Sequence, residues 1–254
     1  MIKCKNYIGI IYAIILEVLF VVISVAVSKY LNGARWYLFS SFLRIIFGIL
    51  TIVLLNKMYQ RSLREIFSNK MWKTALWAGS GFLLYALYVL CAIIFGYKTD
   101  GPKIVGLTVS LFVTQIILQQ ITTGFWEEGL FRGLVLEGYF NCEKKKTYTR
   151  LLYAMMSFLM FAAIHMVGGF DIYSFFYTGT IGFAFATIYL KSHNIILPMI
   201  LHFLYDIPMN LVKYMEFNNS KLFVTWYSAN EVMIGIMFVV SFVILVYDKK
   251  EKQK

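Results

Sequence analysis

Uncharged apolar runs recur along the chain at a length that spans a lipid bilayer as a helix. The run 104–126 carries no charged residue, and about 20 apolar residues are enough for one crossing. The chain has 254 residues, of which 60% are hydrophobic, with a mean hydropathy of +0.70. One soluble core cannot enclose so much apolar surface. The sequence therefore predicts an all-α, polytopic membrane protein.

The apolar runs predict about eight transmembrane helices within a single transmembrane domain, 1–254. The fourth run is too long for one straight crossing, so we expect it to be tilted or broken near Gly124. Between the second and third runs, 56–73 mixes basic and apolar residues, which is typical of an amphipathic helix on the membrane surface. The predicted spans are approximately 8–28, 36–55, 74–97, 104–140, 150–167, 172–191, 195–213 and 229–247.

The distribution of Lys and Arg predicts which helix ends face the cytoplasm. With the N-terminus inside, sixteen basic residues flank the inner ends of the predicted helices and six flank the outer ends. This bias predicts a multi-pass protein of the cell membrane with both termini in the cytoplasm. The net charge of +11 is then explained by membrane-flanking residues, and we expect no nucleic-acid partner.

Two adjacent carboxylates and an arginine interrupt the fourth predicted helix. Glu127, Glu128 and Arg132 all lie in the nine-residue stretch 124–132. Each charge at the centre of a membrane helix costs roughly 2.5–3.5 kcal/mol on insertion scales. In a helix Glu128 and Arg132 stand at i and i+4 and can pair, while Glu127 points about 100° away. A structural salt bridge to Arg44 is the alternative. The cost of the cluster favours a functional site.

Three more ionisable residues lie at a similar predicted depth on other helices. Counted from the basic residues at the inner ends, Glu127, His165, His202 and Asp206 lie about 25, 22, 16 and 22 Å deep at ~1.5 Å per residue. His202 and Asp206 also share one helix face as i and i+4. We therefore expect these residues, together with Glu128, to line one polar cavity that the helices enclose.

The remaining intramembrane charges are expected to have structural roles. Glu17 and Arg44 are single charges in the first two predicted helices, and we expect them to be paired. Glu137 lies nearer the inner face, where its side chain is expected to snorkel toward water. His193 falls in a short turn between two helices and is expected to be solvated.

Carboxylates and imidazoles in a low-dielectric site can hold and deprotonate a water molecule, and an imidazolium or another donor can stabilise an oxyanion. The same groups can instead bind a divalent metal such as Zn²⁺ through Glu127, His165, His202 and Asp206. The sequence has no H-E-x-x-H stretch and no G-x-S-x-G stretch. These side chains favour hydrolysis of an amide by activated water within the membrane, with or without a metal.

Three motifs, in order on successive apolar helices, resemble the CPBP family of CAAX prenyl proteases and bacteriocin-processing enzymes, also called the Abi family. They are Glu127-Glu128-xxx-Arg132, Phe161-xxx-His165 and His202-xxx-Asp206, in a catalytic core of approximately 104–213. The resemblance implies an all-helical intramembrane peptidase with a water-filled cavity.

The resemblance also implies a role for each motif residue. Glu127 and His165 would activate water, His202 and Asp206 would help to hold the oxyanion, and Arg132 would support Glu128. An ionised Asp cannot donate a hydrogen bond. Asp206 is therefore protonated, orients His202, or ligates a metal.

Three functions fit these features. The first is a peptidase acting on a peptide or prenylated protein in contact with membrane lipids, with bacteriocin maturation or self-immunity as specific cases. The second is a non-catalytic membrane regulator that binds a sensor kinase or another membrane partner. The third is an ion- or proton-coupled transporter, because such proteins also carry intramembrane charges. Inverted repeats would favour this function, and the sequence has no clear internal repeat.

Overall fold

The computed structural model of the protein describes residues 5–62, 65, 72–96, 103–142, 147–216 and 220–246. Of the predicted amphipathic helix 56–73, residues 63, 64 and 66–71 lie outside the described residues, and its first part, 56–59, continues the second helix. The elements are, in chain order, α1 (Lys5–Ser28), α2 (Gly33–Tyr59), α4 (Trp72–Gly96), β1 (Lys103–Ile104), α5 (Val109–Leu111), η1 (Phe112–Leu118), α6 (Gln119–Glu128), η2 (Gly129–Leu134), α7 (Val135–Phe140), α8 (Thr147–His165), α9 (Ile172–Ser192), α10 (Ile196–Leu211), η3 (Val212–Tyr214), β2 (Met215–Glu216) and α11 (Ser220–Val246).

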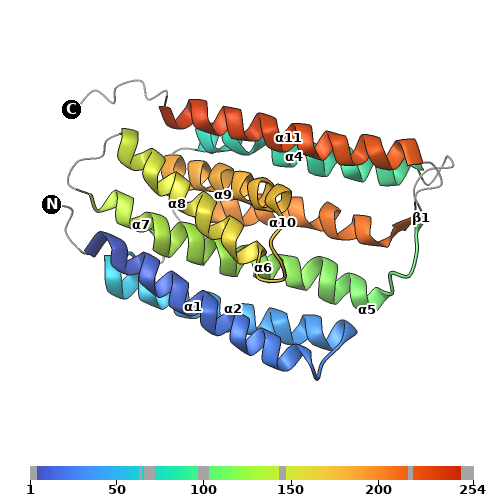
Figure 1. Ribbon diagram of the computed structural model, residues 1–254, viewed down its shortest axis with the longest axis horizontal. Helices are drawn as coiled ribbons and strands as arrows, with labels where there is room; N and C mark the ends of the chain where they lie inside the picture. Colours follow the sequence, from blue (N-terminus) through green and yellow to red (C-terminus); the bar gives the residue numbers. More distant parts are fainter. Residues whose placement is uncertain are drawn as a thin grey trace.

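The helices of the described part follow the predicted ranges in order, with α5 to α7 forming one continuous segment, here called the motif helix. In Figure 1 successive segments alternate in direction along the bundle. The start of α1 and the end of α11 consequently lie at the same end of the bundle (Figure 1). This arrangement positions residues of the motif helix, α8 and α10 at the middle of the molecule.

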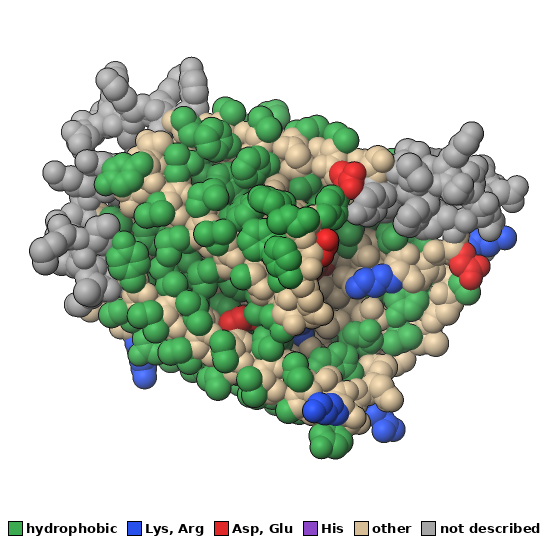
Figure 2. All heavy atoms as spheres, in the orientation of Figure 1, with side chains coloured by type: hydrophobic (Ala, Val, Ile, Leu, Met, Phe, Trp, Pro, Cys, Tyr) green, Lys and Arg blue, Asp and Glu red, His purple; other side chains and the backbone are tan. Residues whose placement is uncertain are grey.

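Four helices in the described part are long and apolar enough to cross a membrane, at Tyr7–Ser28, Gly33–Tyr59, Thr147–His165 and Ser228–Val246. Their outward side chains are apolar, as Val18 and Val22 of α1 are more than half exposed. Figure 2 shows hydrophobic side chains over most of one face of the bundle, with only scattered charged ones. The protein is therefore an all-α membrane protein. The larger number of crossings, about eight, and an enclosed cavity stay predictions.

The motif helix differs from its prediction in where it is irregular. It runs without a break through Gly124, which lies inside α6, and it has two π-helical stretches, η1 and η2, on either side. A Cβ atom at Gly124 would lie 3.0 Å from the carbonyl oxygen of Met199. The glycine therefore lets α10 approach closely and does not break the helix. π-Helical turns are rare and are frequent at functional sites.

A two-stranded antiparallel sheet, absent from the sequence prediction, joins the motif helix to α10 at one end of the bundle. Lys103 pairs with Glu216, and Ile104 pairs with Met215. Each strand has only two residues, which is too short for an alternation of apolar and polar residues to be recognised. The sheet ties the start of the motif helix to the segment that follows α10.

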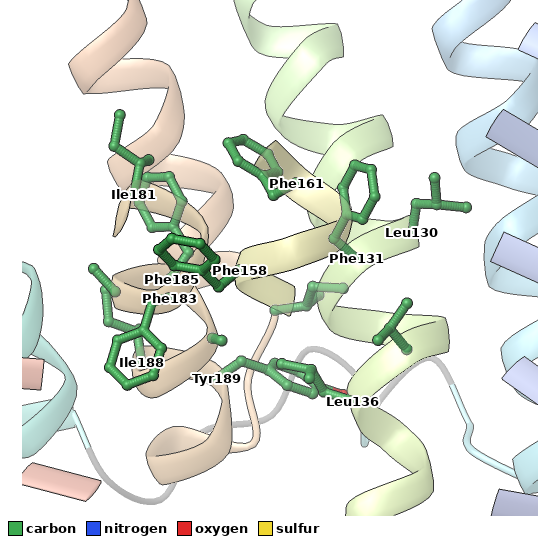
Figure 3. Close-up of a cluster of buried hydrophobic side chains, with 14 of the residues drawn as sticks. Leu130, Phe131, Leu136, Phe158, Phe161, Ile181, Phe183, Phe185, Ile188 and Tyr189 are labelled. Atoms are coloured by element: carbon green, nitrogen blue, oxygen red, sulfur yellow. The ribbon is translucent and has the colours of Figure 1, made fainter. Parts of the chain in front are cut away.

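The centre of the bundle is a packed cluster of aromatic and aliphatic side chains. Figure 3 shows side chains of the motif helix, α8 and α9 meeting in this cluster. Phe131 meets Phe161 edge-to-face with ring centroids 5.4 Å apart, and Leu130 and Phe185 are fully buried. Close packing of this kind fixes the relative positions of the helices that carry the polar residues.

Candidate active site

Glu128 and Arg132 form a buried ion pair where α6 meets η2. Nε of Arg132 lies 3.0 Å from Oε2 of Glu128, and neither side chain is exposed. This is the predicted contact between positions i and i+4. The structural alternative was a salt bridge from this cluster to Arg44, and there Glu127, not Glu128, lies within electrostatic range of Arg44. The side chain of Glu127 remains 16% exposed, because neighbouring residues of a helix point in different directions.

His202 of α10 lies among three carboxylates. Its Nδ1 is 2.8 Å from Oε1 of Glu128, and its Nε2 is 3.4 Å from Oδ2 of Asp206 and 3.8 Å from Oε2 of Glu127. An ionised carboxylate accepts only, so Nδ1–H donates to Glu128 while Nε2 faces the other two carboxylates. The structure thus brings Glu127, Glu128, His202 and Asp206 together with Arg132.

Aromatic rings hold the cationic members of this group in place. The guanidinium carbon of Arg132 lies 4.7 Å from the ring centre of Phe161 and 5.1 Å from that of Phe185. Phe185 also stacks on the His202 ring, with centroids 5.1 Å apart and planes 25° apart. Desolvated cation–π contacts contribute about 2 kcal/mol or more. Phe185 was not singled out from the sequence, because it is one of 23 phenylalanines.

A glycine on α9 gives the site its close packing. The carbonyl oxygen of Gly182 accepts hydrogen bonds from Nη2 of Arg132 at 3.4 Å and from Oγ of Ser157 at 3.3 Å. A Cβ atom at Gly182 would lie 2.7 Å from Cβ of Phe161. Any larger residue would therefore push α8 away from α9, and with it the Phe161 ring that covers Arg132.

His165 lies at the edge of the group. Its Nδ1 is 2.7 Å from the carbonyl oxygen of Phe161, so Nδ1–H donates to the backbone and Nε2 remains as an acceptor. The ring of Phe161 lies 4.6 Å from the His165 ring and 5.9 Å from the His202 ring. His165 is within electrostatic range of Asp206. Its direct participation in one site with the others stays a prediction.

Two charged residues of the first helices lie closer to the site than expected. Glu17 and Arg44 are each within electrostatic range of Glu127, and Arg44 is also within range of Asp206. Nη1 of Arg44 donates to Oγ of Ser40, and its guanidinium carbon lies 5.1 Å from the ring centre of Phe20. The rule that an intramembrane charge indicates a functional site could have identified both.

Glu137 and His193 do not behave as expected from the sequence. Glu137 is 2% exposed, and its carboxylate contacts Arg61, Tyr189 and His193 instead of reaching water. His193 is only partly exposed, because its ring stacks on that of Phe140 at a centroid distance of 3.5 Å. The prediction for Glu137 was wrong, and that for His193 was right about the turn but incomplete about its contacts, because each residue was judged alone. The partners come from other helices and leave no local pattern in the sequence.

The divalent metal expected as an alternative would need three or more ligands directed at one point. No group of three or more His, Cys, Asp or Glu side chains among the described residues is arranged to hold a metal ion. His202 and Asp206 are close enough to bind the same metal ion. Nδ1 of His165, by contrast, is hydrogen-bonded to the backbone. The divalent metal stays a prediction, which a measurement of metal content would test.

The fold and the site together define an all-α membrane protein in which buried Glu128, His202 and Arg132 lie beside partly exposed Glu127 and Asp206. The family model described as type II CAAX prenyl endopeptidase Rce1-like matches residues 108–208. This range contains all three motifs, and the predicted resemblance to the CPBP family of CAAX proteases is confirmed. At the level of the family, the match is to CAAX-protease-like intramembrane peptidases. No curated protein and no solved structure matches the chain.

Proposed function

We propose that the protein hydrolyses a peptide bond of a membrane-associated peptide or protein, with Glu127 as the general base that activates water. The arrangement of His202 carries this proposal. Its Nδ1 is held by Glu128, and its Nε2 lies 3.8 Å from Glu127, so both groups face the same point. A carboxylate and an imidazole that converge in a low-dielectric site are suited to proton transfer. The family match of residues 108–208 supports the same reaction class.

The two carboxylates of the pair would have different tasks. Both oxygens of Glu128 already face Arg132 or His202, so its charge is compensated and it is less suited to take a proton from a substrate water. Among the described residues Glu127 has no ion-pair partner as close as these, and its side chain is partly exposed. Glu127 is therefore the better candidate for the base, and Glu128 for holding His202 and Arg132.

His202 and Asp206 would act on the oxyanion that forms when water attacks the carbonyl carbon. In the imidazolium form both ring nitrogens donate, and Nε2–H can then stabilise the developing charge. Oδ2 of Asp206 lies 3.4 Å from Nε2. A separation of 3.4 Å is long for a hydrogen bond, so Asp206 would orient His202 through its charge, one of the alternatives left by the sequence, and Nε2–H stays available to the oxyanion. His165, with a free Nε2, would assist Glu127.

The substrate class follows from where the site lies. Glu127 and His202 lie inside the motif helix and α10, and the outward side chains of the bundle are apolar, so a peptide would reach them from the membrane. A prenylated C-terminus or an apolar leader or signalling peptide has this property. Bacteriocin maturation and self-immunity are specific forms of the proposal.

We also infer eight crossings with both termini in the cytoplasm. The alternating directions of the segments in Figure 1 support an even number of crossings, and the Lys and Arg bias of sixteen to six supports the orientation.

The test is product formation by the purified full chain. Protein in detergent is incubated with a farnesylated peptide and with a library of apolar peptides, and products are identified by mass spectrometry. Metal content is measured on the same sample, and a chelator arm compares rates. We expect defined cleavage products. A folded protein that cleaves nothing, while its removal still changes a cellular phenotype, would favour the non-catalytic regulator instead.

A further inference from the structure

Glu137 is the centre of a second polar group, here called the clasp, formed by Glu137, His193, Tyr189 and Arg61. The hydroxyl of Tyr189 donates to Oε2 of Glu137 at 2.6 Å, and Nε2 of His193 lies 3.0 Å from the same oxygen. Nη1 of Arg61 donates to Oε1 at 3.2 Å. The clasp therefore joins α7, the end of α9, the turn before α10 and the residues that follow α2.

The turn that carries His193 is held in one conformation. His193 ends α9 with a left-handed backbone (φ 51°), and its N–H donates to the carbonyl oxygen of Tyr189 at 2.7 Å. Its ring stacks on Phe140, which is three residues after Glu137 on α7. The ring therefore has a fixed position relative to both the motif helix and the first residues of α10.

The clasp and the candidate active site connect the same two chain segments. In the active site Glu128 of the motif helix contacts His202 of α10, at 2.8 Å. In the clasp Glu137 contacts His193, at 3.0 Å. Glu137 is nine residues after Glu128, and His193 is nine residues before His202. The two Glu–His contacts thus mark one antiparallel alignment of the motif helix with the segment that leads into α10.

A single Glu–His contact between two helices leaves them free to slide and to rotate about it. A second contact about 13 Å away, at ~1.5 Å per residue, removes that freedom. Between the two contacts a Cβ atom added at Gly133 would lie 3.4 Å from Cδ1 of Ile195, an apolar contact that allows close approach without specifying a position. A slip of one residue would move His202 by about 1.5 Å, and misplacement by 1 Å costs roughly a hundredfold in rate.

Burial of Glu137 is not explained by stability alone. Buried ion pairs are weak sources of stability, and their best-attested use is to fix one alignment of packed helices. The carboxylate is paired on both oxygens and nearly without solvent contact. A polar group with this geometry is satisfied in one alignment only.

We propose that the clasp sets the alignment of α10 on the motif helix and thereby positions His202 between Glu127 and Glu128. Glu137 and His193 are positioning residues, since neither contacts the reacting groups. The effect on turnover rests on the proposed peptidase function, whereas the effect on the position of His202 does not.

The chain has only three histidines, so ¹⁵N labelling of imidazole gives signals from His165, His193 and His202 alone. Each signal is assigned by replacing one histidine with glutamine. In Glu137→Gln we expect the signals of both His193 and His202 to shift, and kcat per folded molecule to fall about tenfold or more with KM within twofold. Tyr189→Phe removes one hydroxyl only, and it should show smaller changes in the same direction if Glu137→Gln fails to fold.

Val89→Ala is the matched control, because Val89 is fully buried in α4 and belongs to neither polar group. It should lower the thermal midpoint and leave the His202 signal and kcat unchanged. The proposal is overturned, whatever the turnover, if the His202 signal does not shift in folded Glu137→Gln. If Glu137→Gln does not fold, an unshifted His202 signal in Tyr189→Phe overturns it. A wild type without turnover contradicts the proposed function and leaves the clasp to be decided by the His202 signal. An unchanged kcat in Glu137→Gln, with wild-type turnover measured, also overturns it.

Discussion

Nδ1 of His202 lies 2.8 Å from Oε1 of Glu128, so the histidine of α10 is held by the carboxylate that also pairs with Arg132. One buried carboxylate thereby serves an arginine on its own helix and a histidine on another. The remaining nitrogen of His202 is directed at Glu127 and Asp206. The adjacent Glu127 is left as the less engaged member of the pair. The two carboxylates are therefore expected to respond differently to substitution.

Replacing Glu128 by Gln should destabilise the fold. The variant keeps the size of the side chain but leaves Arg132 buried without its ionic partner, which typically costs about 3–5 kcal/mol. We expect less monodisperse protein in detergent and a lower thermal midpoint. Glu216→Gln, at an exposed carboxylate of β2, should leave both unchanged. A Glu128→Gln protein as stable as the wild type would show that Arg132 does not depend on this pair.

Cysteines at positions 127 and 202 should crosslink with short bifunctional reagents. The side chains now at these positions approach to 3.8 Å, so their Cβ atoms are within the reach of such reagents. The background protein has Cys4, Cys91 and Cys142 replaced. Cysteines at 127 and 193 serve as the negative control, because position 193 lies at the clasp and not at the candidate active site. Equal crosslinking of both pairs, or of neither in folded protein, would contradict the alignment of α10 with the motif helix.

Gly182→Ala should destabilise the protein by about 1–3 kcal/mol, as overpacked cores do. The added Cβ would lie 2.7 Å from Cβ of Phe161, so α8 or α9 must move. Gly235→Ala is the matched change in α11, where an added Cβ meets nothing within 4 Å. Alanine there should be neutral or stabilising by up to about 1 kcal/mol. Thermal midpoints of the two variants in the same detergent test this difference, and equal midpoints would count against the described packing of α8 on α9.

A reporter fused after Lys254 should be active only if it is of a type that functions in the cytoplasm. The physical basis is the excess of Lys and Arg at the inner helix ends and the common end of the bundle reached by α1 and α11. Paired fusions to a cytoplasmic and an extracytoplasmic reporter give the readout. Activity of the extracytoplasmic reporter would overturn the eight-crossing arrangement.

The contacts that depend on spacing along one helix were predictable from the sequence. Glu128 with Arg132 and His202 with Asp206 both follow from the separation of four residues and helix geometry alone. The order and approximate limits of the helices also followed, because apolar runs of membrane length are an unambiguous signal. The sequence resemblance then indicated which of the polar residues belong together.

Contacts between helices were not predictable in the same way. The Glu137–His193 contact joins residues 56 positions apart, and no spacing rule connects them. The π-helical stretches η1 and η2 were missed because they have no composition of their own. The proximity of Arg44 to Glu127 depends on how α2 packs against α6, where Gly48 of α2 faces the ring of Phe125. A depth estimate gives the level of a residue in the membrane but not its direction around the helix.

The role of Glu127 as the base is tested most directly by the rate of peptide-bond hydrolysis by Glu127→Gln, measured per folded molecule beside the wild type. The substrate is the peptide that the wild type cleaves fastest, and folded protein is quantified by size-exclusion chromatography in detergent. We predict a fall in rate of about 10²–10⁴-fold, the contribution of a general base, with the amount of folded protein nearly unchanged. His202→Ala should lose activity in the same way. A folded Glu127→Gln protein that retains a rate within threefold of the wild type would contradict the assignment of Glu127 as the catalytic base.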